Sequence, residues 1–493
     1  MKKQFIFLLA IMYSTAAYPQ GKIVGKIKEA VTKNDAEAHL IFLASDEMRG
    51  RGTGSPEAAI AANYIATQFE LAGLRTVGGS NTYFQEVGLQ RSQLPKTLDL
   101  KLGDDYFKYK DDLLLLRGKS LAFEGNFVFV GYGNPDDFNG VDVKGKVVVA
   151  YTGSSEKSDA RESLRKVSRA KYKLVREKGA VGLVEIVMFS DIPWPILSGF
   201  FGPRVSLADP TEVVDIPHLL LKKSTSESIS HLVQQKTGRG TIVVDLTDPK
   251  PIPGKNVIGL IQGKDDKLKQ EYIILSAHYD HLGVRKNNTP DSIYNGARDN
   301  ALGTTAILEA AKFFARNPPR RSVLVMALCA EEVGLLGSNW YANHPLIPLK
   351  QTVYNLDCDG AGYNDKTIVT LIDLNRTTAD ALLTKGSLTF GLTLKGDPVP
   401  DQDLYERSDN YNFAVKGVPA VDFSPGIKSF DDELMKYYHQ PPDEVSSLDF
   451  DYLEKFYRAY VYSAYLIANS PERPSWKAGD KFEEAGKTLY GSN

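Results

Sequence analysis

The feature that most constrains this chain is an alternation of short apolar runs and amphipathic stretches between Asn256 and Ala468. The apolar runs include YIILSA, SVLVMALCA and TVYNL, and predicted helices lie at 300–317, 377–390 and 450–468. Strands that are apolar throughout are buried on both faces, and intervening helices serve as the crossovers of a parallel sheet. We therefore predict an α/β fold, a three-layer sandwich with a mainly parallel central sheet.

A second region interrupts this pattern, as expected for a chain of 493 residues, which is too long for one hydrophobic core. Short apolar runs bounded by glycine, among them GNFVFVGYG and GKVVVAYTG, predict a separate set of strands from about Gly125 to Leu246. The proline-containing segment Asp248–Asn256 is typical of a linker. We predict the N-terminal part of the main domain at 21–120, an inserted β-rich domain at 121–248, and the remainder of the main domain at 249–493.

The N-terminus has the pattern of a secretory signal peptide. Lys2 and Lys3 precede an apolar run from Phe5 to Tyr13, which is followed by small residues. This run has about half of the roughly 20 residues that a membrane-spanning helix needs. We expect a cleaved signal peptide at 1–20, no membrane anchor, and export to the periplasm or the cell exterior.

The charged residues and the cysteines exclude several classes of protein. Lys and Arg number 59 against 61 Asp and Glu, which gives a net charge of −2, and the chain contains no basic tract. We therefore expect neither nucleic acid nor an anionic membrane as a partner. With only two cysteines, Cys329 and Cys358, the chain is neither a disulfide scaffold nor a cysteine-rich zinc protein. The pattern leaves open whether the two form a disulfide.

Polar residues with metal-binding side chains follow three of the apolar runs. YIILSA leads to His278 and Asp280, VLVMALCA leads to Glu331 and Glu332, and TVYNL leads to Asp357. In an open α/β sheet, ligands bind at the carboxyl ends of the strands. The three strands are thus expected to bring histidine and carboxylate side chains to the same edge of the sheet.

Two loops add further candidates. Asp299 comes just before a predicted helix that Asn300 could cap, and the alternative is that Asp299 is part of the cap itself. His439 lies in a loop that Pro441 and Pro442 hold, and the alternative for this histidine is simple surface exposure.

These residue types suit metal-assisted hydrolysis. Histidines and carboxylates without a thiolate are ligands for zinc or a similar divalent ion in an open catalytic site. Two ions about 3.5–4 Å apart require a bridging ligand, which a carboxylate can be, and a spare carboxylate would serve as general base. Glu331 and Glu332 are adjacent, so one can bind metal while the other reaches the water. Asp280 is on the same strand face as His278 and could accept its second ring N–H.

The ordered motifs SAHYDHLG, NGARDNALG, AEEVGLLGS, NLDCDG and YYHQPPDE resemble the co-catalytic zinc aminopeptidase and glutamate carboxypeptidase family of metallopeptidases. LASDEMRGRGTGSPE and RSDNYNFAVKGVPA are similar to the same family, and the insert resembles its protease-associated (PA) domain. The resemblance covers nearly the whole mature chain. It implies two zinc ions, one bound by His278 and Asp357 and the other by Glu332 and His439, with Asp299 as bridge, Glu331 as general base and Asp280 as support for His278.

Some residues near these motifs depart from the family pattern or compete with it. Arg298 stands where the family often has a small or acidic residue, and Asn410 stands where histidine is more usual. Asp359, two residues after Asp357, is a rival ligand. We expect His281 to support a ligand or to pack in the loop beside the site, rather than to bind metal. The remaining histidines are expected to be structural or on the surface: His39, His218, His231 and His344.

Tyr405 or Tyr411 is expected to donate a hydrogen bond to the tetrahedral intermediate, because an amide hydrolase needs such a donor. The resemblance implies a zinc-dependent exopeptidase with a peptide substrate, and an aminopeptidase that removes N-terminal residues is the first choice. A carboxypeptidase or dipeptidase of the same family, a glutaminyl cyclase and a non-catalytic receptor-like relative are the alternatives. No motif identifies the pocket residues that select among them or specifies the oligomeric state.

Overall fold

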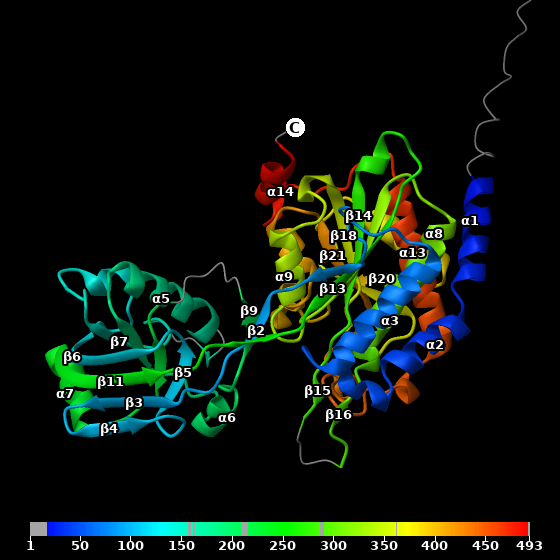
Figure 1. Ribbon diagram of the computed structural model, residues 1–493. Coiled ribbons are helices and arrows are strands. Elements are labelled where there is room, and N and C mark those ends of the chain that lie inside the picture. The colour runs from blue at the N-terminus through cyan, green and yellow to red at the C-terminus, as the bar shows by residue number, and fades with distance from the viewer. Residues whose placement is uncertain are drawn as a thin grey trace, which may run out of the picture. The chain divides into compact units, whose positions relative to one another are not determined.

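The computed structural model describes residues 17–155, 159–160, 163–208, 215–285, 290–360 and 362–491. The chain forms two compact units (Figure 1). The first unit, Met1–Leu89 with Ile252–Asn493, is built from two stretches of chain, and the second unit, Gln90–Pro251, is inserted between them in the sequence. Residues 1–16 of the signal peptide predicted at 1–20 lie outside the described residues.

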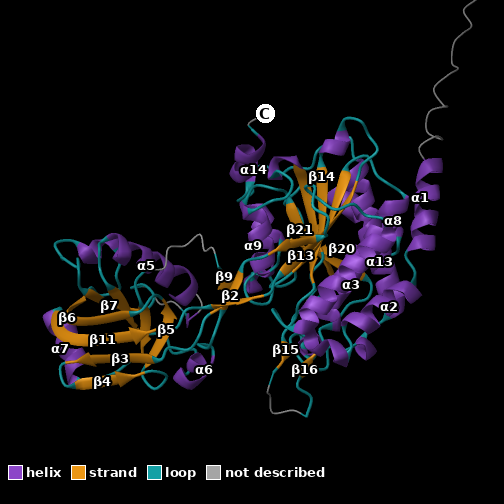
Figure 2. Cartoon of the chain, in the orientation of Figure 1, coloured by secondary structure: helices purple, strands orange, loops and turns teal. Residues whose placement is uncertain are grey.

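The core of the first unit is an eight-stranded sheet (Figure 2). In spatial order its strands are β1 (Phe84–Glu86), β13 (Lys255–Ile261), β17 (Ser322–Leu328), β14 (Tyr272–His278), β18 (Thr352–Asp357), β21 (Ala420–Pro425), β19 (Ile368–Ile372) and β20 (Thr393–Gly396). The four central strands β17, β14, β18 and β21 run parallel, and β13 and β19 are their antiparallel neighbours. The predicted α/β fold with a mainly parallel sheet is confirmed.

Helices cover both faces of this sheet, which makes the three layers (Figures 1 and 2). One face carries α2 (Lys33–Leu43), α3 (Pro56–Ala72), α8 (Leu302–Arg316) and α13 (Phe450–Asn469). The other carries α9 (Leu336–Asn343) and α11 (Asn410–Val415), whose Tyr341 and Phe413 pack on Ile274 and Met326 of the sheet. The unit also contains α1 (Ala17–Ala30), α10 (Asp380–Thr389), α12 (Asp432–Met435), α14 (Glu483–Tyr490) and the small hairpin of β15 (Gly283–Val284) and β16 (Ile293–Tyr294).

The helix boundaries follow the capping residues of the sequence. Ser55 accepts a hydrogen bond from the Ala58 N–H at the start of α3, and Gly73, in the left-handed conformation, ends that helix. Before α8, the Asn300 side chain accepts from the Gly303 N–H at 2.9 Å. Asn300 is therefore the residue that caps this turn, and the carboxylate of Asp299 is left for other contacts.

The second unit has its own eight-stranded sheet. In spatial order its strands are β4 (Asp105–Lys108), β3 (Thr97–Leu102), β11 (Thr237–Asp245), β6 (Leu121–Phe129), β7 (Val147–Tyr151), β8 (Gly182–Ile186), β10 (His218–Leu221) and β5 (Leu113–Arg117). Since β3 pairs with β11 and β5 pairs with β10, the unit begins at Gln90, and the boundary predicted at 121 was too late. The α-helices in the described residues of this unit are α5 (Ser168–Glu177), α6 (Trp194–Gly199) and α7 (Glu227–Gln235). A separate three-stranded sheet is formed by β2 (Leu89–Arg91), β9 (Val205–Leu207) and β12 (Lys250–Ile252).

A buried ion pair lies in the interior of the second unit. The Glu185 carboxylate is fully buried, with Lys171 Nζ 2.6 Å from Oε1 and His218 Nε2 3.4 Å from Oε2, and it accepts a hydrogen bond from Ser168. Burial would raise the pKa of this carboxyl, but His218 and Lys171 overcome that effect and hold its pKa at about 2.

The helices and the two cysteines bear on the expected absence of a membrane anchor and on the disulfide that the sequence left open. Among the helices in the described part of the chain, none is long and apolar enough to cross a membrane. Cys329 and Cys358 are both buried, and both are free thiols in this structure. The disulfide that the sequence left open is therefore not formed.

Candidate metal centre

The strand-end residues of the first unit lie at the carboxyl edge of its parallel strands. His278 is the last residue of β14, Asp357 is the last residue of β18, and Glu331 and Glu332 follow β17 within a few residues. The parallel register places His278 beside Leu328, so the two strand ends coincide. Parallel strands have their carboxyl ends at one edge, which is why residues distant in sequence meet there.

Asp299 lies between two histidines and offers one carboxylate oxygen to each. Its Oδ1 is 3.3 Å from His278 Nε2, and its Oδ2 is 3.0 Å from His439 Nε2. Glu332 Oε2 is 3.4 Å from the same nitrogen of His439. The structure thus brings together four of the five predicted ligands, and Asp299 has the placement that a bridging carboxylate requires.

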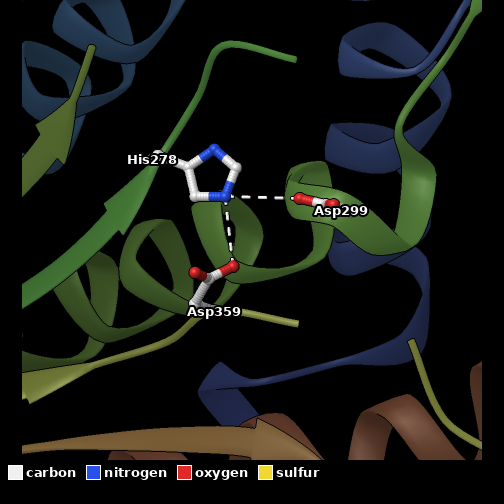
Figure 3. A group of neighbouring side chains, drawn as sticks. All are labelled: His278, Asp299 and Asp359. Atoms are coloured by element: carbon white, nitrogen blue, oxygen red, sulfur yellow. Dashed lines mark hydrogen bonds and ion pairs between the residues drawn. The ribbon is translucent and has the colours of Figure 1, made fainter. Parts of the chain in front are cut away.

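Figure 3 shows the group formed by His278, Asp299 and Asp359. Asp359 Oδ1 is 3.1 Å from His278 Nε2, on the same ring nitrogen that faces Asp299. The side chain of Asp357 is engaged elsewhere, since its Oδ1 accepts a hydrogen bond from Ser276 at 2.5 Å and its Oδ2 accepts one from Ser408 at 3.4 Å. Asp359, the rival ligand of the sequence analysis, is therefore the aspartate that contacts His278.

His281 completes a second group, although the sequence predicted that it would support a ligand or pack beside the site rather than bind metal. Its Nδ1 is 2.5 Å from Glu332 Oε1 and 3.9 Å from Asp299 Oδ1. Among the described residues, His281 Nδ1 and Glu332 Oε1 have each other as an ion pair without the geometry of a hydrogen bond, and His281 Nε2 has no hydrogen-bond partner. Buried polar atoms of proteins are nearly always hydrogen-bonded, and a convergence of such atoms without hydrogen bonds fits a divalent cation.

The described residues thus contain two groups of three side chains that could each hold a metal ion. In each group, one potential ligand atom of every member lies within 4.8 Å of those of the other two. Asp299 belongs to both groups, which are His278 with Asp299 and Asp359, and His281 with Asp299 and Glu332. The donor set is imidazole nitrogen and carboxylate oxygen, as zinc in an open site prefers.

The clustered charges move the pKa values of the site in opposite directions. Burial disfavours the charged form of His278, but the carboxylates of Asp359 and Glu331 outweigh this and raise its pKa well above its usual value. Burial would raise the pKa of Asp299, yet His281, His278 and His439 hold it well below its usual range. The surrounding charges therefore favour the charged forms of His278 and Asp299.

Glu331, the predicted general base, lies beside this cluster. Its Oε2 is 3.9 Å from His278 Nε2, and it belongs to neither group of three. Burial raises the pKa of Glu331 well above its usual value, and the nearby carboxylates Asp359 and Glu332 add to this, against the opposing effect of His278. A carboxyl group whose pKa is raised in this way holds a proton more readily than one in water.

Asp280 supports the site in a different way from the one predicted. The Nδ1 atom of His278 faces the backbone carbonyl of Asp280 at 3.0 Å, so the carboxylate is not the acceptor for this ring. That carboxylate accepts hydrogen bonds from the Thr53 hydroxyl at 2.6 Å and from the Glu331 N–H at 3.1 Å. The prediction that it accepts the imidazole N–H was wrong, because the strand turns after His278 and presents its main chain to the ring.

The segment before Asp299 is held from the His439 loop. The Asp443 carboxylate accepts from the Arg298 N–H at 2.8 Å and from the Asp299 N–H at 3.2 Å, and its main-chain oxygen accepts from the Ala297 N–H. The Arg298 side chain points away and donates to the Ser447 carbonyl at 2.6 Å. Asp443 thus couples the loops that carry two candidate ligands, Asp299 and His439.

Of the tyrosines proposed to contact the intermediate, Tyr405 lies in the hydrophobic core and Tyr411 is half-buried against it. Tyr405 is buried, and its hydroxyl donates to the Ala420 carbonyl at 3.0 Å. Tyr411 packs edge-on against Tyr405 and against Phe482 in the same cluster. The predicted role is therefore wrong for Tyr405, and Tyr411 shares its surroundings.

A different tyrosine, Tyr438, lies against the candidate ligand His439. Its ring stacks on His439 with centroids 4.2 Å apart, and its hydroxyl accepts a hydrogen bond from Arg407 at 2.7 Å. The sequence contains this residue in the motif YYHQPPDE, directly before the histidine, and that adjacency was the signal that could have identified it.

Other supporting residues gave weaker signals in the sequence. Arg51 and Thr53 occur in the glycine-rich turn at 47–57, and Asp443 follows the two prolines after His439. Only their contacts with distant strand ends show that they belong to the site. His281 and Asp359 each lie within three residues of a predicted ligand, and their ring or carboxylate direction decides between binding and packing.

Comparison with known proteins agrees with this geometry. Residues 256–464 match peptidase family M28. Aminopeptidase YwaD of Bacillus subtilis is 25% identical over 355 residues, which cover 66% of this chain and 69% of that protein. Probable glutamate carboxypeptidase AMP1 of Arabidopsis thaliana is 27% identical over 293 residues, 49% of this chain but only 39% of the longer plant protein.

Among solved structures, the aminopeptidase from Aneurinibacillus sp. strain AM-1 has a TM-score of 0.56 at 19% identity, and the match covers 91% of this chain and 97% of that one. At this identity the likeness shows a common fold. Together with the sequence match, it supports the metallopeptidase resemblance of the motifs. Over residues 256–464, the chain is therefore similar to the peptidases of family M28.

Proposed function

We propose that this protein is an exported, zinc-dependent exopeptidase, and specifically an aminopeptidase that removes N-terminal residues from peptides. The observation that carries the proposal is the position of Asp299, which is common to both metal-binding groups and directs one oxygen to each of two histidines. Such an arrangement suits a site for two zinc ions bridged by one carboxylate. The similarity to YwaD supports the choice of an aminopeptidase.

The residues that would hold the two ions follow from the geometry. His278 with Asp299 and an aspartate of the turn after β18 would hold one, and Asp359 is the aspartate that faces His278. Glu332 and His439, with His281 beside Glu332, would hold the other. Zinc at these positions would polarise the scissile carbonyl and lower the pKa of a bound water towards neutrality.

The protein's own side chains would move the protons of the reaction. Glu331 would take a proton from the attacking water and pass it to the nitrogen of the leaving amine. Asp280 would fix the position of this base by accepting a hydrogen bond from its backbone N–H. Tyr438, held by Arg407, would donate a hydrogen bond to the oxyanion of the tetrahedral intermediate, the role that sequence reasoning gave to Tyr405 or Tyr411.

The substitution Glu331→Gln tests this proposal. It removes the base but keeps the shape of the side chain, and Glu331 belongs to neither metal-binding group. We expect two zinc ions per chain in both proteins and a loss of turnover by at least about 100-fold in the variant, the scale of general-base catalysis. A variant with wild-type turnover would contradict the role of Glu331, and a wild-type protein without zinc-dependent hydrolysis would contradict the function itself.

A second assay separates the alternatives within the same chemistry. An aminoacyl-anilide should be hydrolysed, whereas an N-blocked dipeptide should not, and the opposite preference would indicate a carboxypeptidase. A free dipeptide cleaved in preference to longer peptides would indicate a dipeptidase. One zinc ion per chain with cyclisation of N-terminal glutamine would indicate a glutaminyl cyclase, and zinc binding without any hydrolysis would indicate a receptor-like protein.

Two further parts of the proposal concern the N-terminal segment and the inserted unit. The charged, apolar and small residues at 1–20 support export by a cleaved signal peptide, which the N-terminal sequence of the mature protein would test. The mixed sheet of the second unit supports its assignment as a PA domain inserted into the peptidase.

A further inference from the structure

The glycine-rich turn at 47–57 places a fully buried arginine behind the metal centre. The side chain of Arg51 is 0% exposed, and in the described part of the chain its guanidinium donates to no carboxylate, although the charges of Asp443, Asp280, Asp299 and Glu332 act on it from a greater distance. All of its hydrogen bonds go to main-chain carbonyls, namely those of Leu43, Tyr279, Asn295 and Gly296. A buried charge without a partner carboxylate is costly, so hydrogen bonds to backbone dipoles must compensate for its burial.

The carbonyls that Arg51 contacts belong to the two loops that carry the ligands. Arg51 Nε donates to the carbonyl of Tyr279, the residue after His278, at 2.8 Å. Its two terminal nitrogens donate to the carbonyls of Asn295 at 2.7 Å and Gly296 at 2.9 Å, which lie just before Asp299. A single planar group thus spans two segments of the chain that deliver adjacent ligands.

The main chain of Arg51 makes a third link to the site. Its carbonyl accepts from the His281 N–H at 3.3 Å. This close approach depends on the preceding residue, because a Cβ on Gly50 would lie 2.2 Å from the Tyr294 carbonyl oxygen and Gly50 has φ of +65°. The turn is therefore shaped so that the arginine enters between the ligand loops.

We propose that Arg51 is a positioning residue that fixes the distance between the His278 and Asp299 loops through its guanidinium, and thereby sets the zinc affinity of the site. The inference rests on the proposed function, since it concerns the same metal centre. The planar fork is essential to this role, because it donates in several fixed directions at once, whereas a lysine ammonium is a point charge. Outer groups that orient metal ligands typically change metal affinity about 10–100-fold when removed.

The chain offers a matched control in a second buried arginine. Arg321 is 1% exposed, and it donates to the Ile467 and Ser470 carbonyls, besides its bond to Glu271 at 2.7 Å. It precedes β17, at the end of that strand opposite to Glu331 and Glu332. Loss of its fork should reduce the stability of the fold without changing the metal centre.

The experiment compares wild type, Arg51→Lys and Arg321→Lys as full-length proteins. Zinc dissociation constants are measured by competition with a chromophoric chelator, and thermal unfolding is measured on the zinc-free proteins. Hydrolysis of an aminoacyl-anilide is measured at saturating zinc. We expect both variants to lose thermal stability, and only Arg51→Lys to bind zinc at least about 10-fold more weakly.

Equal zinc affinities in Arg51→Lys and Arg321→Lys would overturn the proposal. If Arg51→Lys does not fold, the same comparison is made with Arg51→Gln, which still donates from one amide. Failure of both variants to fold, while Arg321→Lys folds, would assign Arg51 to folding and also overturn the proposal. Failure of the proposed function would appear separately, as zinc binding by the wild-type protein without hydrolysis.

Discussion

A group of titratable side chains around the buried Glu309 of α8, with members on α2 and α3, gives a quantitative test of the electrostatics of the first unit. The Glu309 side chain is fully buried, with Lys312 Nζ 2.9 Å from its Oε2 and His39 Nε2 3.8 Å from its Oε1. The other ring nitrogen of His39 is 2.8 Å from the Tyr64 hydroxyl. A buried carboxyl with one partly exposed lysine as its partner is expected to hold its proton.

The magnitude follows from the pKa of Glu309, which burial raises from 4.5 to about 7 although Lys312 opposes the change. Between these pH values the unfolded chain loses a proton that the folded protein keeps. The contribution of Glu309 to stability is therefore complete below pH 4.5 and is lost as the pH rises through about 7. At about 1.4 kcal/mol per pH unit, the loss is about 3 kcal/mol.

His39 has the opposite effect on the pH dependence. Burial lowers its pKa from 6.5 to about 4. Its contribution to stability is complete above pH 6.5 and is lost as the pH falls through about 4, by a similar amount. The two groups offset one another in the wild-type protein between about pH 4.5 and 6.5, and removal of either one exposes the other.

We therefore expect Glu309→Gln to gain stability relative to wild type by about 2–3 kcal/mol between pH 5 and pH 8. The free energy of unfolding is measured with urea and circular dichroism in the presence of a chelator, so that metal binding does not contribute. Glu29→Gln, on the exposed surface of α1, is the control and should follow wild type at both pH values. If the difference between Glu309→Gln and wild type changes by less than about 0.5 kcal/mol, the reasoning is refuted.

Three further predictions concern the site and the insert. Asp443→Ala leaves two buried N–H groups without an acceptor, and we expect a loss of about 3 kcal/mol in urea unfolding together with weaker zinc binding in the chelator assay. Asp359→Asn should weaken zinc binding more than Asp357→Asn does, and the reverse order would return the ligand role to Asp357. Glu185→Gln leaves Lys171 as an uncompensated buried charge, and should destabilise the second unit by about 3–5 kcal/mol in thermal or urea unfolding; a change below about 1 kcal/mol would show that the pair is not isolated from water.

The sheet and the general position of the site could be predicted because both depend on local pattern. Runs such as YIILSA are apolar throughout, so they had to be buried strands, and His278 at the end of one had to lie at the carboxyl edge. The same argument placed Glu331 and Glu332 there. Local sequence pattern therefore predicts on which strand a residue lies and at which end of that strand.

The direction of individual side chains could not be predicted in this way. Asp357 ends β18 and Asp359 lies two residues beyond it, and their choice of partner depends on Ser276 and Ser408, which come from other parts of the chain. Arg51 was missed for a similar reason, since its partner Tyr279 is 228 residues away in the sequence. The prediction for Tyr405 was wrong because a tyrosine hydroxyl can donate its hydrogen bond to a core carbonyl as readily as to a substrate.

The insertion point of the second unit has a consequence for chain entropy. β1 and β13 are antiparallel neighbours, with Glu86 opposite Lys255, and the whole second unit connects them. In effect they form a β-hairpin whose loop is a domain. Loop-closure entropy grows only with the logarithm of length, so a loop of roughly 170 residues in place of a turn of about 5 costs about 3 kcal/mol. A folded insert has fixed ends and lowers even this cost, so the hairpin can accept an insert of almost any size while the ligand-bearing strands keep their register.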